Sequence, residues 1–234
     1  MERYILSLGF SIIKNYLTFL PISLVFRYRK TLLNRCNMRG AIPLSRAEIK
    51  SLLKVTKCQR EKTLLTIGFS CAFRISAILS LTIGDVSTNG IVHNRITVAA
   101  KNQKTKTGHT VLLNSDAKKS IESLLEWLKA KGITDKSAPL FLSQKRTVNG
   151  ALKAISRIQA HRILKELFAQ VGLLGSSYST HSMRKSVAKY IYDMTGGKIE
   201  KVAAILGHKS LNSTIAYLQF NNSDIDDALT AMEF

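Results

Sequence analysis

One stretch near the C-terminus reads Leu206-Gly-His-Lys-Ser-Leu-Asn-Ser-Thr-Ile-Ala-Tyr217. Glycine commonly ends a helix, so Gly207 is expected to close a helix over residues 198–206 and to present His208 in the loop that follows. Tyr217 stands nine residues after that histidine, in a short helix that Ser210 can cap. Taken alone, such a tyrosine is more often a packing residue than a nucleophile, so the stretch gains its meaning from the rest of the chain.

A second polar group precedes this stretch and reads Thr180-His-Ser-Met-Arg184. His181 and Arg184 are three residues apart and therefore share one face of a helix. With Thr180 as the expected N-cap, both side chains lie near the first turn, where backbone N–H groups and the helix dipole favour an anion. The arginine fork adds donors that match phosphate oxygens.

A third cationic position lies far upstream. Arg74 is the only charged residue between positions 63 and 84, a largely apolar run. We expect it to be buried with a strong partner, because an unpaired buried charge is very costly. Two arginines, two histidines and a tyrosine together suggest a site that grips a phosphodiester and attacks its phosphorus with a phenolic oxygen.

The charge of the whole chain agrees with such a substrate. Lys and Arg number 35 against 15 acidic residues, a net charge of +20. This excess favours a polyanionic partner, with nucleic acid preferred over a membrane surface, although a lysine-rich soluble protein has the same signature. Residues 4–26 are mostly apolar but contain Lys14, which argues against a transmembrane helix. The three cysteines show no C-x-x-C spacing, so no zinc site is expected.

In this order, the motifs resemble the catalytic domain of tyrosine recombinases, the phage integrase family. The stretch Phe73-Arg-Ile-Ser-Ala-Ile-Leu-Ser-Leu-Thr-Ile-Gly-Asp85 resembles the first arginine motif of that family, and the two stretches quoted above resemble the second and third. The resemblance covers about residues 42–222. Two features depart from the family: Ala77 stands where an acidic residue is common, and residues 1–40 are shorter than the usual core-binding domain.

The resemblance implies a mechanism and a set of catalytic residues. Tyr217 would attack a DNA phosphorus and form a 3′-phosphotyrosyl link, with His181 helping to remove its proton. Arg74 and Arg184 would bracket the non-bridging oxygens, and His208 would donate a hydrogen bond to the phosphate. The expected catalytic set is Arg74, Lys106, His181, Arg184, His208 and Tyr217.

The lysine of this set is the least defined by the sequence. The family carries it on the turn of a β-hairpin, where Lys101, Lys104 and Lys106 all stand. Lys106 is chosen because Thr105-Lys-Thr-Gly108 most resembles the turn of the family, and Lys104 comes next. It would protonate the departing 5′ oxygen. All three lysines would alternatively be solvated contacts to the DNA backbone.

The expected partner is double-stranded DNA, bound by a homotetramer as the resemblance implies, with no membrane and no small-molecule substrate. No cofactor and no metal ion are required, because the covalent link stores the energy of the broken bond. The compartment is expected to be intracellular and DNA-associated, either the cytoplasm and nucleoid or a DNA-containing organelle. Two other functions remain open: a catalytically silent DNA-binding protein of the same fold, and an enzyme similar to type IB topoisomerases.

The expected fold is mainly α with a small antiparallel β-hairpin, an α+β arrangement. Residues 1–40 are expected to form a short, basic helical segment, a remnant or part of a core-binding region. Residues 41–222 form the catalytic domain, and residues 223–234 an amphipathic tail that docks on a neighbouring subunit or on its own domain. Strands are predicted over residues 91–99 and 109–113, after turns at Gly84-Asp85 and Asn89-Gly90. Helices are predicted over residues 61–70, 75–81, 116–131, 151–171, 181–194 and 198–206.

Overall fold

The computed structural model describes residues 40–98, 108–144 and 150–218. The chain divides into two units, Met1–Gly40 and Ala41–Phe234, and the fold below is that of the second unit. The N-terminal segment, the lysines of the hairpin turn and the C-terminal tail all lie outside the described residues. Within those ranges, no helix is both long enough and apolar enough to cross a membrane.

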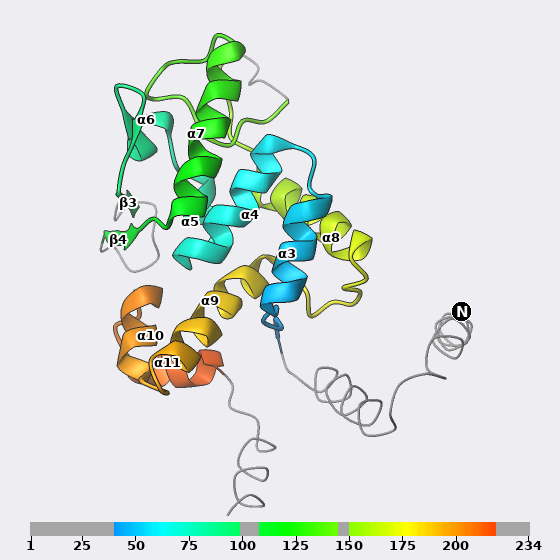
Figure 1. The fold of residues 1–234 in the computed structure, drawn as a ribbon, viewed down its shortest axis with the longest axis vertical. Coiled ribbons are helices and arrows are strands. Elements are labelled where there is room, and N and C mark those ends of the chain that lie inside the picture. The colour runs from blue at the N-terminus through cyan, green and yellow to red at the C-terminus, as the bar shows by residue number, and fades with distance from the viewer. Residues whose placement is uncertain (1–39, 99–107, 145–149, 219–234) are drawn as a thin grey trace, which may run out of the picture. The chain divides into compact units, whose positions relative to one another are not determined.

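The described part is mainly helical with two small antiparallel sheets, as expected (Figure 1). The helices are α3 (Arg46–Val55), α4 (Gln59–Cys71), α5 (Ile75–Leu79), α6 (Ile83–Val86), α7 (Ser115–Ala130), α8 (Arg157–Gln170), α9 (Thr180–Met194), α10 (Ile199–Leu206) and α11 (Leu211–Leu218). The strands are β1 (Ser87–Thr88), β2 (Ile91–Val92), β3 (Arg95–Val98) and β4 (His109–Leu112).

Helix α4 is the centre of the fold. It contacts α7 and α9, and Figure 1 shows it enclosed by them and by α3. Its residues from Thr63 to Gly68 are all buried, which explains the apolar run seen in the sequence. At Gly68 the fit to α9 is tight, because a Cβ atom there would lie only 2.4 Å from the Sδ atom of Met183. The absence of a side chain at Gly68 therefore lets the two helices approach closely, and α9 carries Arg184.

The sheets consist of two short hairpins. Strands β1 and β2 are joined by Asn89 and Gly90, both with positive φ angles (52° and 82°), as the predicted turn requires. Strands β3 and β4 pair in register from Arg95 opposite Leu112 to Val98 opposite His109. The predicted strand over residues 91–99 is therefore interrupted, because its first part pairs with β1 and its second part with β4.

Two helix predictions were wrong in their bounds. Helix α8 begins six residues later than expected, because the residues before it are extended: Ala154 bridges to Leu142, and the Ile155 amide donates to Phe141 (2.9 Å). The second is the helix predicted over residues 75–81, which ends at Leu79. Gly84-Asp85 is not a turn but part of α6, whose start is fixed by a capping box between Thr82 and Asp85.

Candidate active site

The start of α9 differs from the expected one by a residue. Ser179, not Thr180, is the N-cap: its hydroxyl accepts from the His181 amide (3.3 Å), and its own amide donates to the Ser182 hydroxyl (3.1 Å). His181 is therefore in the first turn, with an exposed side chain. Arg184 follows about one turn later on the same helix, within a run of buried residues from Ser182 to Ala188.

Arg184 is the more deeply buried of two neighbouring cations at this site: it is only 3% exposed, against 9% for Lys185. Its Nη1 donates to the carbonyl of Ala72, and its Nη2 to the carbonyl of Leu206 (2.7 Å). These carbonyls lie at the C-terminal ends of α4 and α10, where helix carbonyls lack intrahelical partners and the helix dipole is negative. Two helix ends thus stabilise a charge with no carboxylate partner among the described residues. Burial still lowers the pKa of the Arg184 guanidinium to about 10, so it remains charged at neutral pH.

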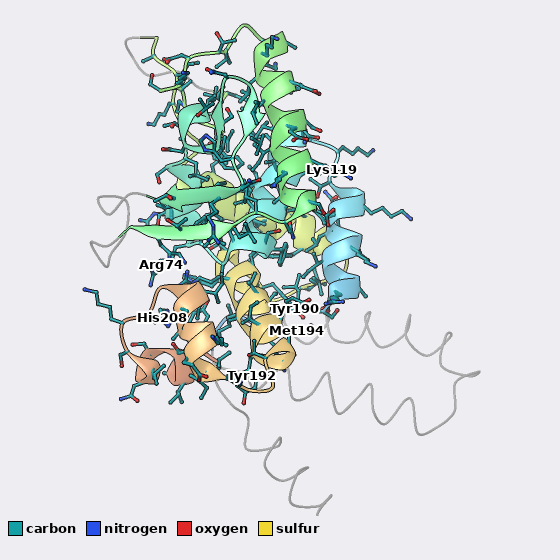
Figure 2. The ribbon with its side chains drawn as sticks, turned by 60° about the vertical axis from the view of Figure 1, so that its left-hand side comes forward. Arg74, Lys119, Tyr190, Tyr192, Met194 and His208 are labelled. Atoms are coloured by element: carbon teal, nitrogen blue, oxygen red, sulfur yellow. The ribbon has the colours of Figure 1, made fainter. Side chains whose placement is uncertain are left out.

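The expectation that Arg74 is buried with a strong partner is wrong. Arg74 is partly exposed, as the N-cap residue of α5, and its guanidinium has no hydrogen-bond or ion-pair partner in the described part of the chain. Its charge nevertheless acts on the site, because it helps to lower the pKa of both Arg184 and His208. Figure 2 shows Arg74 and His208 next to each other. Arg74 is therefore a cation beside the other site residues, and no described residue occupies its donors.

His208 is held by a side chain on each side of its ring. Gly207 ends α10 in the left-handed conformation (φ 62°), as predicted, and His208 follows it. The Nε2 atom lies 3.3 Å from Arg184 Nη2, and Nδ1 lies 3.0 Å from the Thr214 hydroxyl. A guanidinium only donates, so Nε2 accepts and the proton resides on Nδ1. Burial, Arg184 and Arg74 lower the pKa of His208 to about 4, so the ring is neutral at pH 7.

Tyr217 lies beside these groups on α11. Its ring is 5.7 Å from the His208 ring in an edge-on arrangement, while the Arg184 guanidinium and the Lys185 ammonium lie 5.9 and 5.6 Å from its centroid. Its hydroxyl oxygen is buried and has no hydrogen bond of normal geometry to the described residues. Burial raises the pKa of the phenol above its ordinary value, although Arg184 and then Arg74 partly oppose this. The phenol is therefore neutral, and a base must take its proton when it reacts.

The structure thus brings Arg74, Arg184, His208 and Tyr217 together, while His181 lies one helical turn before Arg184 and Lys106 is outside the described residues. Sequence reasoning missed Thr214 as the partner of His208, and Lys185 beside the tyrosine ring. The position of Thr214, three residues before Tyr217 and so on the same helix face, was the available signal. In the described ranges, no three His, Cys, Asp or Glu side chains are grouped to hold a metal ion.

This combination of fold and site places the chain in the phage integrase family, whose profile matches residues 43–223. Among relatives, it is 33% identical over 171 residues to the probable integrase/recombinase YoeC of Bacillus subtilis (strain 168), covering 73% of this chain and 83% of that protein. It is 26% identical over 198 residues to the tyrosine recombinase XerC of Caldanaerobacter subterraneus, covering 83% of this chain. The chain spans only 52% of that XerC.

Solved structures agree with the fold. The XerA recombinase matches with a TM-score of 0.64 at 20% identity, covering 86% of this chain and 69% of that one. The XerH site-specific recombinase, in a post-cleavage complex with a palindromic difH substrate, matches with a TM-score of 0.62 at 23% identity, covering 84% and 54%. The expected tyrosine recombinase catalytic fold is therefore confirmed.

Proposed function

We propose that this chain is a site-specific DNA recombinase or integrase that breaks and rejoins double-stranded DNA through a 3′-phosphotyrosine intermediate on Tyr217. The observation that carries the proposal is the arrangement around the phenol: Arg184 and His208 beside the ring, and Arg74 near them with donors that no described residue occupies. The net charge of +20 supports a DNA substrate. Solved relatives bound to DNA, such as XerH with difH, support it too.

The two arginines have different tasks in this proposal. Three of the five N–H groups of Arg184 are engaged by the Ala72 carbonyl, the Leu206 carbonyl and His208. The remaining two can donate to a non-bridging oxygen from a position fixed before the substrate arrives. Arg74 is less constrained and supplies a second fork to the phosphate. Preorganised donors of this kind stabilise the charge of the pentavalent transition state, where each contributes about 10²–10³ in rate.

In the chemical step, the phenolic oxygen of Tyr217 forms a bond to phosphorus and the bond from phosphorus to O5′ breaks. The phenol proton passes to His181, and Lys106 gives a proton to the departing O5′. The products are a phosphotyrosine and a free 5′ hydroxyl. Rejoining reverses both bond changes, so no nucleotide cofactor is consumed.

His208 can assist without changing its charge. In the free protein its Nε2 accepts from Arg184, so it cannot also donate to a phosphate. When a phosphate oxygen also takes the Nη2 donor that Arg184 gives to His208, the ring can carry its proton on Nε2 instead of Nδ1. Thr214 permits this exchange, because its hydroxyl can donate to Nδ1 as well as accept from it.

We further propose how the chain is divided into segments and how many copies act together on DNA. Residues 41–222 would form the catalytic domain, residues 1–40 a partial core-binding segment and residues 223–234 a tail between subunits. The active species on DNA would be a homotetramer, which cross-linking of the protein on its DNA site would test. A dimer as the largest assembly on two joined sites would contradict this.

The central experiment traps the covalent intermediate. A nicked duplex loses its short 5′-hydroxyl fragment after cleavage, so a denaturant-resistant protein–DNA adduct accumulates. The wild type is expected to form it, and Tyr217→Phe to bind DNA with unchanged affinity without forming it. Tyr192→Phe, on the neighbouring helix α9, is the matched control and should react normally.

Binding of DNA by the wild type without an adduct would indicate a silent DNA-binding protein. Adducts and relaxation of supercoils, without junctions between two duplexes, would indicate a topoisomerase.

A further inference from the structure

His109 is a half-buried histidine that the proposed chemistry does not use. It is the first residue of β4, directly after the turn that carries the candidate lysines. Its Nε2 donates to the carbonyl of Ile205, 2.9 Å away and 96 residues later in the chain. That carbonyl lies in the last turn of α10, where carbonyls lack helical partners. The next carbonyl, of Leu206, accepts from Arg184. The end of α10 is therefore fixed by two side chains from two other segments.

The imidazole of His109 also fits closely between two backbone segments of the site. Its ring meets the Phe73 ring edge-on, with centroids 5.7 Å apart, and Arg74 directly follows Phe73. On the other side is Gly207, where a Cβ atom would lie 3.3 Å from His109 Nδ1. His208 directly follows Gly207. The His109 side chain therefore lies against Phe73 and Gly207, the residues that directly precede the proposed catalytic residues Arg74 and His208.

We propose that His109 is a positioning residue for His208, an inference that rests on the proposed function. The loop of His208 begins at the end of α10, so the bond from His109 to Ile205 and the bond from Arg184 to Leu206 together set where the loop starts. Without the first bond, the last turn of α10 keeps one side-chain hydrogen bond from another segment, that of Arg184, and can shift against its apolar packing. His208 then leaves its place between Arg184 and Thr214. Displacement of a reacting group by about 1 Å can lower a rate by about 100-fold.

The test uses three variants of the full chain and single-turnover formation of the covalent adduct. His109→Leu removes the donor and keeps an apolar side chain, and it should react about 10- to 100-fold more slowly. His109→Gln keeps an N–H that can reach the Ile205 carbonyl and should stay within about threefold of wild type. Thr110→Val is the matched control: it removes the 2.8 Å bond to Thr97 on the same hairpin without touching α10, and its rate should not change.

A double-mutant cycle gives the decisive reading. If His109 acts through His208, then His109→Leu should have little further effect in a His208→Ala background, because coupled residues are not additive. An equal loss in both backgrounds would overturn the inference. So would a normal rate for His109→Leu, or a loss in a folded His109→Gln as large as that in His109→Leu. If the wild type itself forms no adduct, the proposed function fails, which is a separate result.

Discussion

Replacing Gly68 with alanine tests whether the close approach of α4 and α9 sets the position of Arg184. The new Cβ would lie 2.4 Å from Met183 Sδ and 3.0 Å from its Cε, and Met183 is only 1% exposed. Because favourable contacts between such atoms need about 3.5–4.0 Å, the helices or the methionine must move by about 1 Å. Arg184 follows Met183, and Ala72 lies one turn after Gly68, so this movement acts on the bond between Arg184 and Ala72.

Two opposing effects decide the stability of this variant. Overpacking of a buried contact costs about 1–3 kcal/mol, whereas alanine is better than glycine inside a helix by about 1 kcal/mol. The net loss is therefore about 0–2 kcal/mol, which lowers the unfolding midpoint by roughly 0–8 °C in a chain of this size. The rate of adduct formation should fall more clearly, by about 10-fold or more, because a shift of about 1 Å at Arg184 misplaces a phosphate donor.

Thermal unfolding and single-turnover adduct formation are measured for Gly68→Ala, Met183→Ala and the double variant. Met183→Ala alone opens a cavity and destabilises the protein by about 2–5 kcal/mol. In the double variant the space left by the methionine accommodates the new methyl group, so we expect a favourable coupling of about 1 kcal/mol or more. If Gly68→Ala unfolds above the wild-type temperature and reacts at the wild-type rate, helix propensity alone governs this position and the reasoning is wrong.

Four further predictions concern the site itself. Alanine at Arg184 or Arg74 should each slow adduct formation by about 10²-fold or more; only the Arg184 variant should also unfold at a clearly lower temperature, because it leaves two carbonyls unpaired. Thr214→Val should slow adduct formation by about 10-fold with DNA affinity unchanged, and a Thr214→Ser variant that does not restore the rate would contradict this. The pKa of His208 is lowered to about 4 in the folded chain, so on acidification the unfolded state binds the proton first. The stability that is present above about pH 6.5 should therefore decline toward pH 4. The substitution His208→Gln should flatten that decline in acid-unfolding curves. Affinity for DNA should fall steeply with salt, and a flat dependence would separate the positive charge from DNA binding.

Local signals in the sequence were sufficient for most elements. Gly207 ends α10 in the left-handed conformation, and Asn89-Gly90 forms the hairpin turn, because both depend on the conformational freedom of one or two residues. The capping box at Ser45 and Glu48 that begins α3 is likewise a local pattern, between residues three positions apart. The motifs identified the family, and Arg184, His208 and Tyr217 do lie together.

Long-range contacts explain what the sequence could not provide. The apolar run around Arg74 suggested a buried cation, but that residue falls at a junction between helices and stays partly exposed. The buried cation is Arg184, whose carbonyl partners are 112 and 22 residues away in the chain. The extended pairing of residues 141–143 with 153–155 likewise delayed the start of α8. A main-chain carbonyl leaves no mark in a sequence, because every residue has one.

The support of Arg184 by two helix ends has a consequence for how this protein can change over generations. A carboxylate partner would have to be kept, or lost and regained together with the arginine. Carbonyl groups are present whatever side chain stands at positions 72 and 206, so substitutions there cannot delete the partner directly. Selection then falls on backbone shape, on the left-handed residues Ala72 and Gly207 that end α4 and α10. Substitutions elsewhere that keep this backbone shape leave both hydrogen bonds to Arg184 in place.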